Sequence, residues 1–312
     1  MKPQTDIAAE LYRRTESDPH NLTDPDVAHL IINENKVLGM HAVPGLNVTV
    51  KELEDGVDVK LTLDDGVKIQ KPVHLCFGVY PQEGIQRIIM DVAIGKNAQI
   101  ALMAHCVFPF AVDVQHIMDA KIRIGDGARY SYFERHIHSP KGGVRVYPKA
   151  MVEVGRKAHF KTEFELIKGR VGLIDIDYET SCGAYGVVDM TARISGRAED
   201  IIKIRETGHL KGEYARGVLT SKIAVRDNAR AEVYNKLTAD AAFARGHVDC
   251  KEIVQDSGVA TAVPIVEVHH PKAHITHEAA IGSVDSKQLE TLMSRGLSED
   301  DAIELIINGL LS

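Results

Sequence analysis

One short phrase recurs at a nearly constant spacing through the middle of this 312-residue chain. It consists of an apolar residue, any residue, a second apolar residue, a turn and then an alanine. The clearest copies end at Ala98, Ala128 and Ala158, so these alanines recur every thirty positions. Weaker copies end at Ala198, Ala229 and Ala273. A fixed period with a small residue after each turn is typical of a β-solenoid, whose coils crowd together where they stack.

The segment between Leu46 and Ile281 shows the period-two alternation of half-buried strands, as in Val57–Leu63. Gly, Asp and Asn interrupt these stretches, and no helical segments separate them. This pattern excludes a doubly wound α/β fold. An all-β sandwich also has recurring turns, but the near-constant step of the repeat favours a mainly β solenoid. Because a solenoid ends in an open sheet edge, we expect that edge to be capped or to pair in a dimer.

Both ends of the chain are predicted to be helical. Residues 1–45 form the first region, with helices over Asp6–Tyr12 and over Asp24–Ile32, where Pro25 occupies a first-turn position. Residues 46–283 form the solenoid. Residues 284–312 form a C-terminal region with helices that end at Gly296 and Gly309.

Composition and missing motifs exclude several functions. A net charge of -7 argues against nucleic acid as a partner. No apolar run approaches the roughly 20 residues that cross a bilayer, and Met1–Arg14 contains no apolar signal-peptide core. We therefore expect a cytoplasmic protein that does not bind membranes. The sequence contains no G-x-x-x-x-G-K-[ST] phosphate loop, so any energy from ATP must come from a partner.

The four cysteines are widely scattered, form no CxxC pair and do not suggest a disulfide framework. They are Cys76, Cys106, Cys182 and Cys250. The plainest interpretation of each is a small buried apolar residue, and the roles of the first three stay open.

Cys250 differs from the other cysteines because it lies among polar residues near the end of the predicted solenoid. Its separation from Glu278 is close to one repeat, so stacking of adjacent coils brings the two residues near each other. With His277 they form a candidate site for a soft metal. The alternative is that the histidines of this region simply face solvent. His274 and His277 are three positions apart and point to opposite faces of a strand.

A series of short motifs runs through the C-terminal part of the sequence from Gly246 to Gly309. The motifs are Gly246-His247-Val-Asp-Cys250, Pro264-Ile-Val-Glu267, His277-Glu278-Ala279, Gln288-Leu289, Ser294-Arg295-Gly296, Glu299, Ala302, Ile306 and Asn308-Gly309. In order and spacing, this series resembles the C-terminal signature of the SufB/SufD family of iron–sulfur cluster assembly scaffolds.

This resemblance implies a right-handed parallel β-helix and a non-catalytic scaffold that holds an iron–sulfur cluster transiently. It places Cys250 at the interface between two β-helix subunits, and His277-Glu278 matches the SufB-like form of the site. The C-terminal helices are expected to bind an ABC-type ATPase (SufC-like) through Leu289, Leu292, Arg295, Ile303 and Ile306. The second subunit is either another copy of this chain or a SufD-like paralogue.

The chain departs from the family pattern in two respects. It is shorter than typical SufB, and it lacks the clustered upstream cysteines, which leaves open how a sulfur donor protein delivers sulfur. Two other functions stay open as alternatives. A β-helix carbohydrate-active enzyme is disfavoured because aromatics make up 5% of residues and Trp is absent. A purely structural solenoid would form filaments and need none of Cys250, His277 and Glu278, and its C-terminal helices would serve only as a cap.

Overall fold

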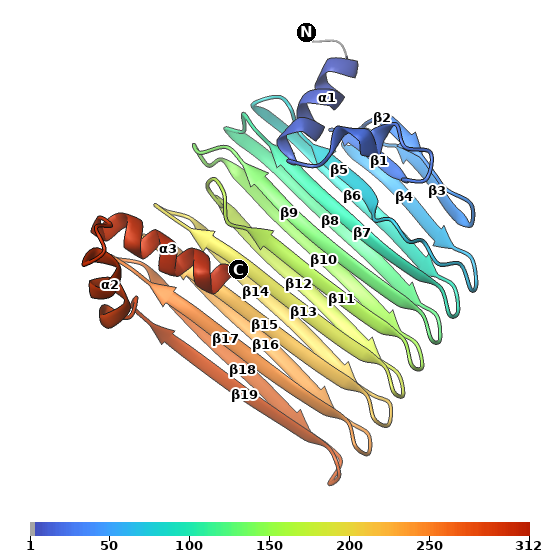
Figure 1. Cartoon of the computed structure of the whole chain (residues 1–312). Coiled ribbons are helices and arrows are strands. Elements are labelled where there is room, and N and C mark those ends of the chain that lie inside the picture. The colour runs from blue at the N-terminus through green and yellow to red at the C-terminus, as the bar shows by residue number, and fades with distance from the viewer. Residues whose placement is uncertain (1–3) are drawn as a thin grey trace.

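The computed structural model describes residues 4–312 and shows one continuous parallel β-solenoid with short helices at its two ends (Figure 1). The strands form two facing sheets. The first has the spatial order β19-β17-β15-β13-β11-β9-β7-β5-β1-β2, and the second has the order β18-β16-β14-β12-β10-β8-β6-β4-β3. Each coil therefore contributes one strand to each sheet, which confirms the predicted mainly β solenoid.

The strands of the first sheet are β1 (His29–Asn33), β2 (Lys36–His41), β5 (Val73–Gly78), β7 (Gln99–Phe108), β9 (Arg129–His138), β11 (His159–Leu166), β13 (Val187–Gly196), β15 (Arg216–Val225), β17 (Arg245–Val254) and β19 (His274–Gly282). Those of the second are β3 (Leu46–Glu52), β4 (Gly56–Leu63), β6 (Glu83–Ile94), β8 (Asp113–Ile124), β10 (Val144–Val154), β12 (Leu173–Cys182), β14 (Ile201–Leu210), β16 (Arg230–Ala239) and β18 (Val259–Val268).

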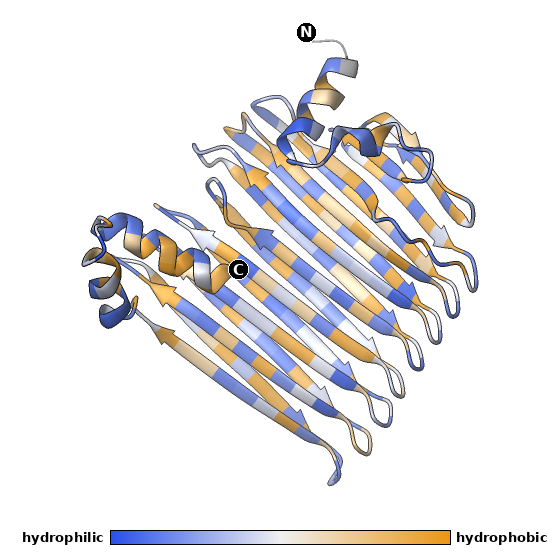
Figure 2. Cartoon of the chain, viewed as in Figure 1, coloured by the Kyte–Doolittle hydropathy of each residue, from blue (hydrophilic) through white to orange (hydrophobic). Residues whose placement is uncertain are grey.

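Alternate residues of each strand point into the lumen between the sheets, where they form one continuous apolar core. The other residues face outward, and Figure 2 shows the resulting alternation of hydrophobic and hydrophilic positions along the strands. Gln99 pairs with Arg129 near the start of the solenoid, whereas Arg245 pairs with His274 near its end. The step between paired strands therefore varies along the solenoid: it is thirty positions from β7 to β9, twenty-eight from β11 to β13 and twenty-nine from β17 to β19.

The repeated alanines mark a real corner of the solenoid, but the predicted series mixes two corners. Ala98, Ala128 and Ala158 are buried and stack at one corner. Backbone hydrogen bonds continue this column through Gly186, Ala215, Ala244 and Ala273. Ala198 and Ala229 lie instead in the turns that join β13 to β14 and β15 to β16, at the opposite corner. Within these turns the two alanines occupy different positions, because the backbone hydrogen bonds at this corner align Ala229 with Asp200 and not with Ala198.

The N-terminal region is only partly helical. Helix α1 (Gln4–Arg14) is present, and a short 3-10 helix, η1 (Pro19–Leu22), follows it. The helix predicted over Asp24–Ile32 is wrong, because this segment is a turn followed by strand β1. Leu30 and Ile32 face the lumen and Ile31 packs under α1, so both faces of β1 are covered. A strand that is covered on both faces has a continuous apolar run in its sequence, and such a run does not distinguish it from a buried helix.

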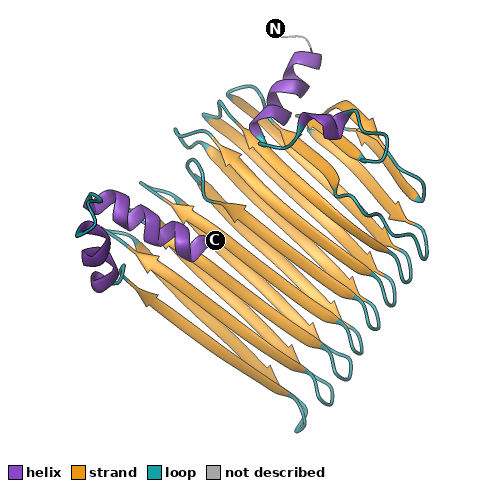
Figure 3. Ribbon diagram, in the orientation of Figure 1, coloured by secondary structure: helices purple, strands orange, loops and turns teal. Residues whose placement is uncertain are grey.

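The C-terminal region contains α2 (Ser286–Met293) and α3 (Glu299–Leu311), which lie at the end of the solenoid opposite α1 (Figure 3). Ser298 caps α3 through a hydrogen bond from the Asp301 amide. Gly309 does not end α3, which continues to Leu311. None of the helices in residues 4–312 is both long enough and apolar enough to span a bilayer.

Candidate functional site

Cys250 lies in β17 and points into the lumen, where its side chain is fully buried. Its neighbours in the parallel pairing are Ser221 of β15 and Ala279 of β19. Burial raises the pKa of the thiol to about 11, and the nearby Glu252 carboxylate contributes to this shift. In the isolated chain Cys250 is therefore a neutral thiol at physiological pH.

Glu278 does not lie beside Cys250 in this chain. The pairing of β17 with β19 places Glu278 opposite Asp249, and side chains at these positions point away from the lumen. His277 is opposite Val248 and so shares the lumenal side of the sheet with Cys250. Both Glu278 and His277 are exposed, because β19 is the last strand of its sheet. The structure thus places His277 with Cys250 on one side of the sheet and Glu278 on the other.

Polar residues from three strands accompany Cys250 in the lumen. The Asn235 amide nitrogen lies 3.9 Å from the Cys250 sulfur, and the Ser221 hydroxyl donates a hydrogen bond to Glu252 over 3.3 Å. Burial raises the pKa of Glu252 to about 7. Within residues 4–312, Asn235 Oδ1 and Glu252 Oε2 are buried and find no hydrogen-bond partner. Such unpaired buried atoms are costly, which suggests that this end of the lumen is built to receive a polar ligand.

On the outer side, Glu278 belongs to a different group. Ligand atoms of His247, Asp249 and Glu278 all lie within 4.8 Å of one another. His247 Nδ1 is 2.7 Å from the Thr276 hydroxyl, and Lys251 pairs with Asp249 over 3.0 Å. This outer group is partly exposed, and Lys251 already neutralises part of its charge.

The C-terminal helices bury only part of their apolar surface. Ile303 packs with Ile307 and Leu311 against Ala224 of β15, so it serves at least partly to hold α3 on the sheet. Leu289, Leu292 and Ile306 are half-buried, and Arg295 is exposed. The largest exposed apolar side chains on these helices are Met293 and Leu305, at 42% and 51% exposure, which sequence reasoning did not single out.

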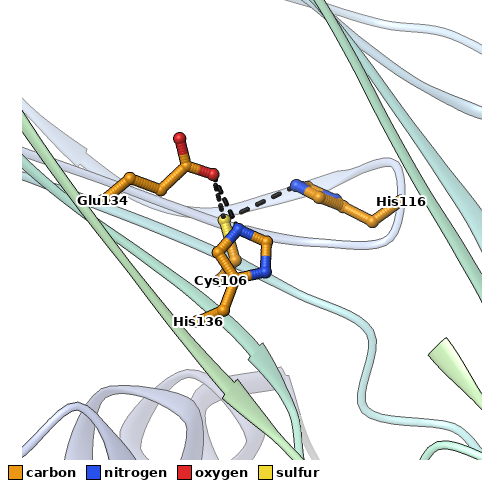
Figure 4. Close-up of side chains that lie close together, drawn as sticks. All are labelled: Cys106, His116, Glu134 and His136. Atoms are coloured by element: carbon orange, nitrogen blue, oxygen red, sulfur yellow. Dashed lines mark hydrogen bonds and ion pairs between the residues drawn. The ribbon is translucent and has the colours of Figure 1, made fainter. Parts of the chain in front are cut away.

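A second cluster, which sequence reasoning missed, lies deep in the lumen near the other end of the solenoid (Figure 4). It contains Cys106 from β7, His116 from β8, and Glu134 and His136 from β9, all fully or almost fully buried. Because β8 belongs to the second sheet, the cluster bridges the two sheets. Cys106 and His136 are one repeat apart and directly opposite each other in the pairing of β7 with β9. A search for polar residues one repeat apart, which is how Cys250 was compared with Glu278, would have found this pair.

Burial controls the protonation of this second cluster. It lowers the pKa of His116 and of His136 to about 3 and raises the pKa of Glu134 above its usual value. The Cys106 thiol has its pKa raised by burial and by the neighbouring Glu134. Both imidazoles and the Cys106 thiol are therefore neutral at physiological pH.

The fold and these sites define a β-solenoid whose apolar lumen holds thiol, imidazole and carboxylate groups suited to soft-metal chemistry. Residues 83–310 match the family model described as SUF system FeS cluster assembly, SufBD core domain. The chain belongs to this family of iron–sulfur cluster assembly proteins.

Two archaeal relatives support this assignment over nearly the whole chain. An iron–sulfur cluster assembly SufBD family protein of Methanocaldococcus jannaschii is 35% identical over 302 residues, covering 97% of this chain and 96% of its own. A protein with the same family description from Pyrococcus horikoshii is also 35% identical, covering 97% of this chain and 92% of its own. A Staphylococcus aureus SufBD family protein matches only 69 residues, 22% of this chain, at 35% identity.

Proposed function

We propose that this chain is the scaffold subunit of an iron–sulfur cluster assembly complex, which builds clusters and transfers them with the help of an ABC-type ATPase. The cluster is cargo that the scaffold holds transiently. Cys250, His277 and Glu278 are the proposed ligands, and two copies of the chain, or one copy and a SufD-like paralogue, meet at the free edge of β19.

The observation that carries this proposal is the position of Cys250 one strand below the edge of the sheet. In the first sheet only β19 lies beyond β17. The β19 edge has no partner strand within the described chain, so it is open to pairing with a second subunit. A cluster at that edge would receive a thiolate and an imidazole from one side of the sheet. The Glu278 carboxylate would reach it from the other side or from the second subunit.

This ligand set suits temporary binding. Four thiolates make a durable cluster site, whereas one thiolate with a harder carboxylate from each subunit makes a labile one. The buried, protonated state of Cys250 adds a requirement for movement. The thiol must lose its proton and become accessible before it binds iron, so the coils near β19 must open.

ATP-driven movement of a partner supplies such opening in this proposal. Helices α2 and α3 are the proposed docking surface, through Leu289, Leu292, Arg295, Ile303 and Ile306. The exposed Met293 and Leu305 add apolar area on the same helices. Because α3 packs on β15, two strands from β19, force on α3 would reach the coils that cover Cys250.

Co-expression with the ATPase tests the proposal. The full chain should copurify with the ATPase, and the complex should pass iron and sulfide to an apo-ferredoxin faster with ATP than without it. Removal of residues 285–312 should abolish copurification. As a finer variant, Leu305→Asp together with Met293→Asp should weaken it without unfolding the solenoid, as far-ultraviolet circular dichroism would verify. Unchanged copurification of both variants would refute docking through the helices, and transfer independent of ATP would refute the ATPase role.

A further inference from the structure

We propose that Cys106, His116, Glu134 and His136 form a permanent site for one divalent transition metal of the zinc–iron class, separate from the cluster site at Cys250. These four residues converge inside the lumen, remote in sequence from Cys250, Glu278 and the C-terminal helices. Their ligand atoms all lie within 4.8 Å of one another. Thiolate sulfur, imidazole nitrogen and carboxylate oxygen are the three ligand types that bind zinc in proteins, and two histidines with one carboxylate also bind ferrous iron.

The spacing of the ligand atoms fits a tetrahedral ion. Metal–ligand bonds of about 2.3 Å for sulfur and about 2.0–2.2 Å for nitrogen and oxygen place tetrahedral sulfur–nitrogen and sulfur–oxygen pairs about 3.5–3.6 Å apart. Cys106 Sγ lies 3.5 Å from His116 Nε2 and 3.6 Å from Glu134 Oε1. The 2.7 Å contact between Glu134 Oε1 and His136 Nε2 must lengthen by about 0.6 Å when the ion replaces the hydrogen bond.

Hydrogen bonds fix the tautomer of His116 so that its Nε2 lone pair faces the centre of the cluster. The Gln86 amide nitrogen donates to two backbone carbonyls, those of Glu34 and Gly78, each over 3.0 Å. Its carbonyl oxygen therefore accepts a hydrogen bond from His116 Nδ1, 3.1 Å away. With the proton on Nδ1, Nε2 of a neutral imidazole is a free ligand atom.

A second chain of hydrogen bonds orients His136 in the same way. His138 Nδ1 donates to the backbone carbonyl of Arg170 over 2.9 Å, which leaves His138 Nε2 as an acceptor. His136 Nδ1 lies 3.1 Å from that atom and donates to it, so His136 Nε2 also directs a lone pair toward Cys106 and Glu134. Both imidazoles thus have the outer-shell support that is typical of metal-ligating histidines.

Two further observations favour an ion over a simple hydrogen-bonded core. Glu134 Oε2 is buried and has no hydrogen-bond partner within residues 4–312, although a free carboxyl oxygen in an apolar lumen is costly. A divalent ion together with the Cys106 thiolate and the Glu134 carboxylate has no net charge, so the occupied site suits a dry interior. Phe108 and Phe164 pack around the histidines, with ring centroids 5.1 Å from His116 and 4.8 Å from His136, respectively.

Zinc content of the intact chain tests the site without iron or sulfide. Protein is produced with added zinc and treated with EDTA to remove surface-bound metal. Its zinc content per chain is then measured by inductively coupled plasma mass spectrometry. We expect about one zinc per chain in the wild type and less than a tenth of that in Cys106→Ser and Glu134→Gln. Cys182→Ser, which removes a different buried thiol, and Asp249→Asn, which disables the outer group, should both keep one zinc. Retention of zinc by Cys106→Ser would overturn the proposal.

A second experiment uses only the wild-type chain, refolded with cobalt(II), and therefore does not depend on whether the variants fold. Wild-type chain that is unfolded and refolded with cobalt(II) should show the strong visible bands of four-coordinate cobalt and a sulfur-to-cobalt charge-transfer band. A native circular dichroism spectrum with neither feature, together with no zinc or ferrous iron after the same refolding, would also overturn the proposal. Cys250→Ala should retain zinc fully, so the outcome here is independent of whether the chain assembles clusters.

Discussion

Cys250 and Glu278 lie on opposite sides of the same sheet, although they are almost one repeat apart in the sequence. The pairing of β17 with β19 sets Glu278 against Asp249, and the partner of Cys250 is Ala279. A shift of one residue in register moves a side chain to the other face of a sheet. The carboxylate that accompanies Cys250 on its own side is Glu252.

The acidity of Cys250 should therefore depend on Glu252 and not on Glu278. Glu252→Gln removes a nearby negative charge and should lower the pKa of the Cys250 thiol, since Glu252 raises it in the native chain. The pH dependence of Cys250 alkylation, followed by mass spectrometry of its peptide, measures this pKa. Glu278→Gln is the matched control and should leave it unchanged. An equal effect of both substitutions would show that the two carboxylates share one environment.

Asp200 should be the most important carboxylate for the fold of the turn that precedes β14. It is fully buried, pairs with Arg170 over 3.0 Å, and accepts hydrogen bonds from the amides of Val171, Gly172 and Arg197. Asp200→Asn should lower the free energy of unfolding by about 3 kcal/mol, because it removes the charge that these donors surround. Urea denaturation measures the loss.

The adjacent Glu199 provides a matched control for this experiment. It also lies near Arg170, at 3.6 Å, but its side chain is 79% exposed. Glu199→Gln should change the free energy of unfolding by less than about 0.5 kcal/mol. Equal losses in the two variants would mean that charge alone, and not burial, determines the effect.

Glu206 should make stability fall as pH rises. Burial in the lumen raises its pKa from 4.5 to about 8. Between these values the unfolded chain releases the proton while the folded chain keeps it. The free energy of unfolding therefore decreases with pH across this window and levels off above about pH 8. Glu206→Gln removes the penalty and should stabilise the protein at pH 8 by on the order of 3 kcal/mol, with little gain near pH 4.5.

Thermal denaturation of both proteins at the two pH values measures the Glu206 effect. Glu267→Gln is a suitable control, because Glu267 is a partly exposed carboxylate whose pKa is lowered by Lys236. It should not reproduce the gain at pH 8. A pH-independent difference between Glu206→Gln and the wild type would contradict a buried, protonated Glu206.

Two glycines should respond in opposite ways to replacement by alanine. Gly309 lies inside α3 with open space around it, so Gly309→Ala should stabilise the helix by about 0.5–1 kcal/mol. A methyl group on Gly56 would overlap the backbone carbonyl of Arg87 in the adjacent strand, so Gly56→Ala should be destabilising by about 2 kcal/mol or more. Hydrogen exchange of α3 reports the first change and urea denaturation the second. Destabilisation by Gly309→Ala would indicate that the helix does end there.

The period of the repeat was enough to predict the solenoid, because each coil imposes the same spacing on turns and strands. Side-chain direction depends on a finer quantity, the step between each particular pair of strands. The step from β17 to β19 is one position longer than the separation of Cys250 and Glu278, so the two side chains fall on different faces. The repeat alone does not fix that step. The strand at Leu30–Ile32 could not be told from a helix because its burial depends on α1 and the lumen together.

The cluster around Cys106 was predictable in part. Cys106 and His136, like Gln86 and His116, are one repeat apart and are paired in adjacent strands. Glu134 and His136 are two positions apart along β9, so both side chains point to its lumenal side. What the sequence did not provide is the approach of His116 from the opposite sheet, since contact across the lumen depends on how the two sheets face each other and not on the repeat.

Anaerobic reconstitution with iron and sulfide, with and without the ATPase partner, tests the central claim most directly. The wild type should acquire stoichiometric iron and acid-labile sulfide with the visible absorption of a thiolate-ligated cluster. Cys250→Ala should lose both iron and sulfide, whereas Cys182→Ala, which removes another buried thiol, should keep them. A Cys250→Ala protein that reconstitutes a cluster of normal stoichiometry, or a wild type that stays colourless under both conditions, would contradict the account.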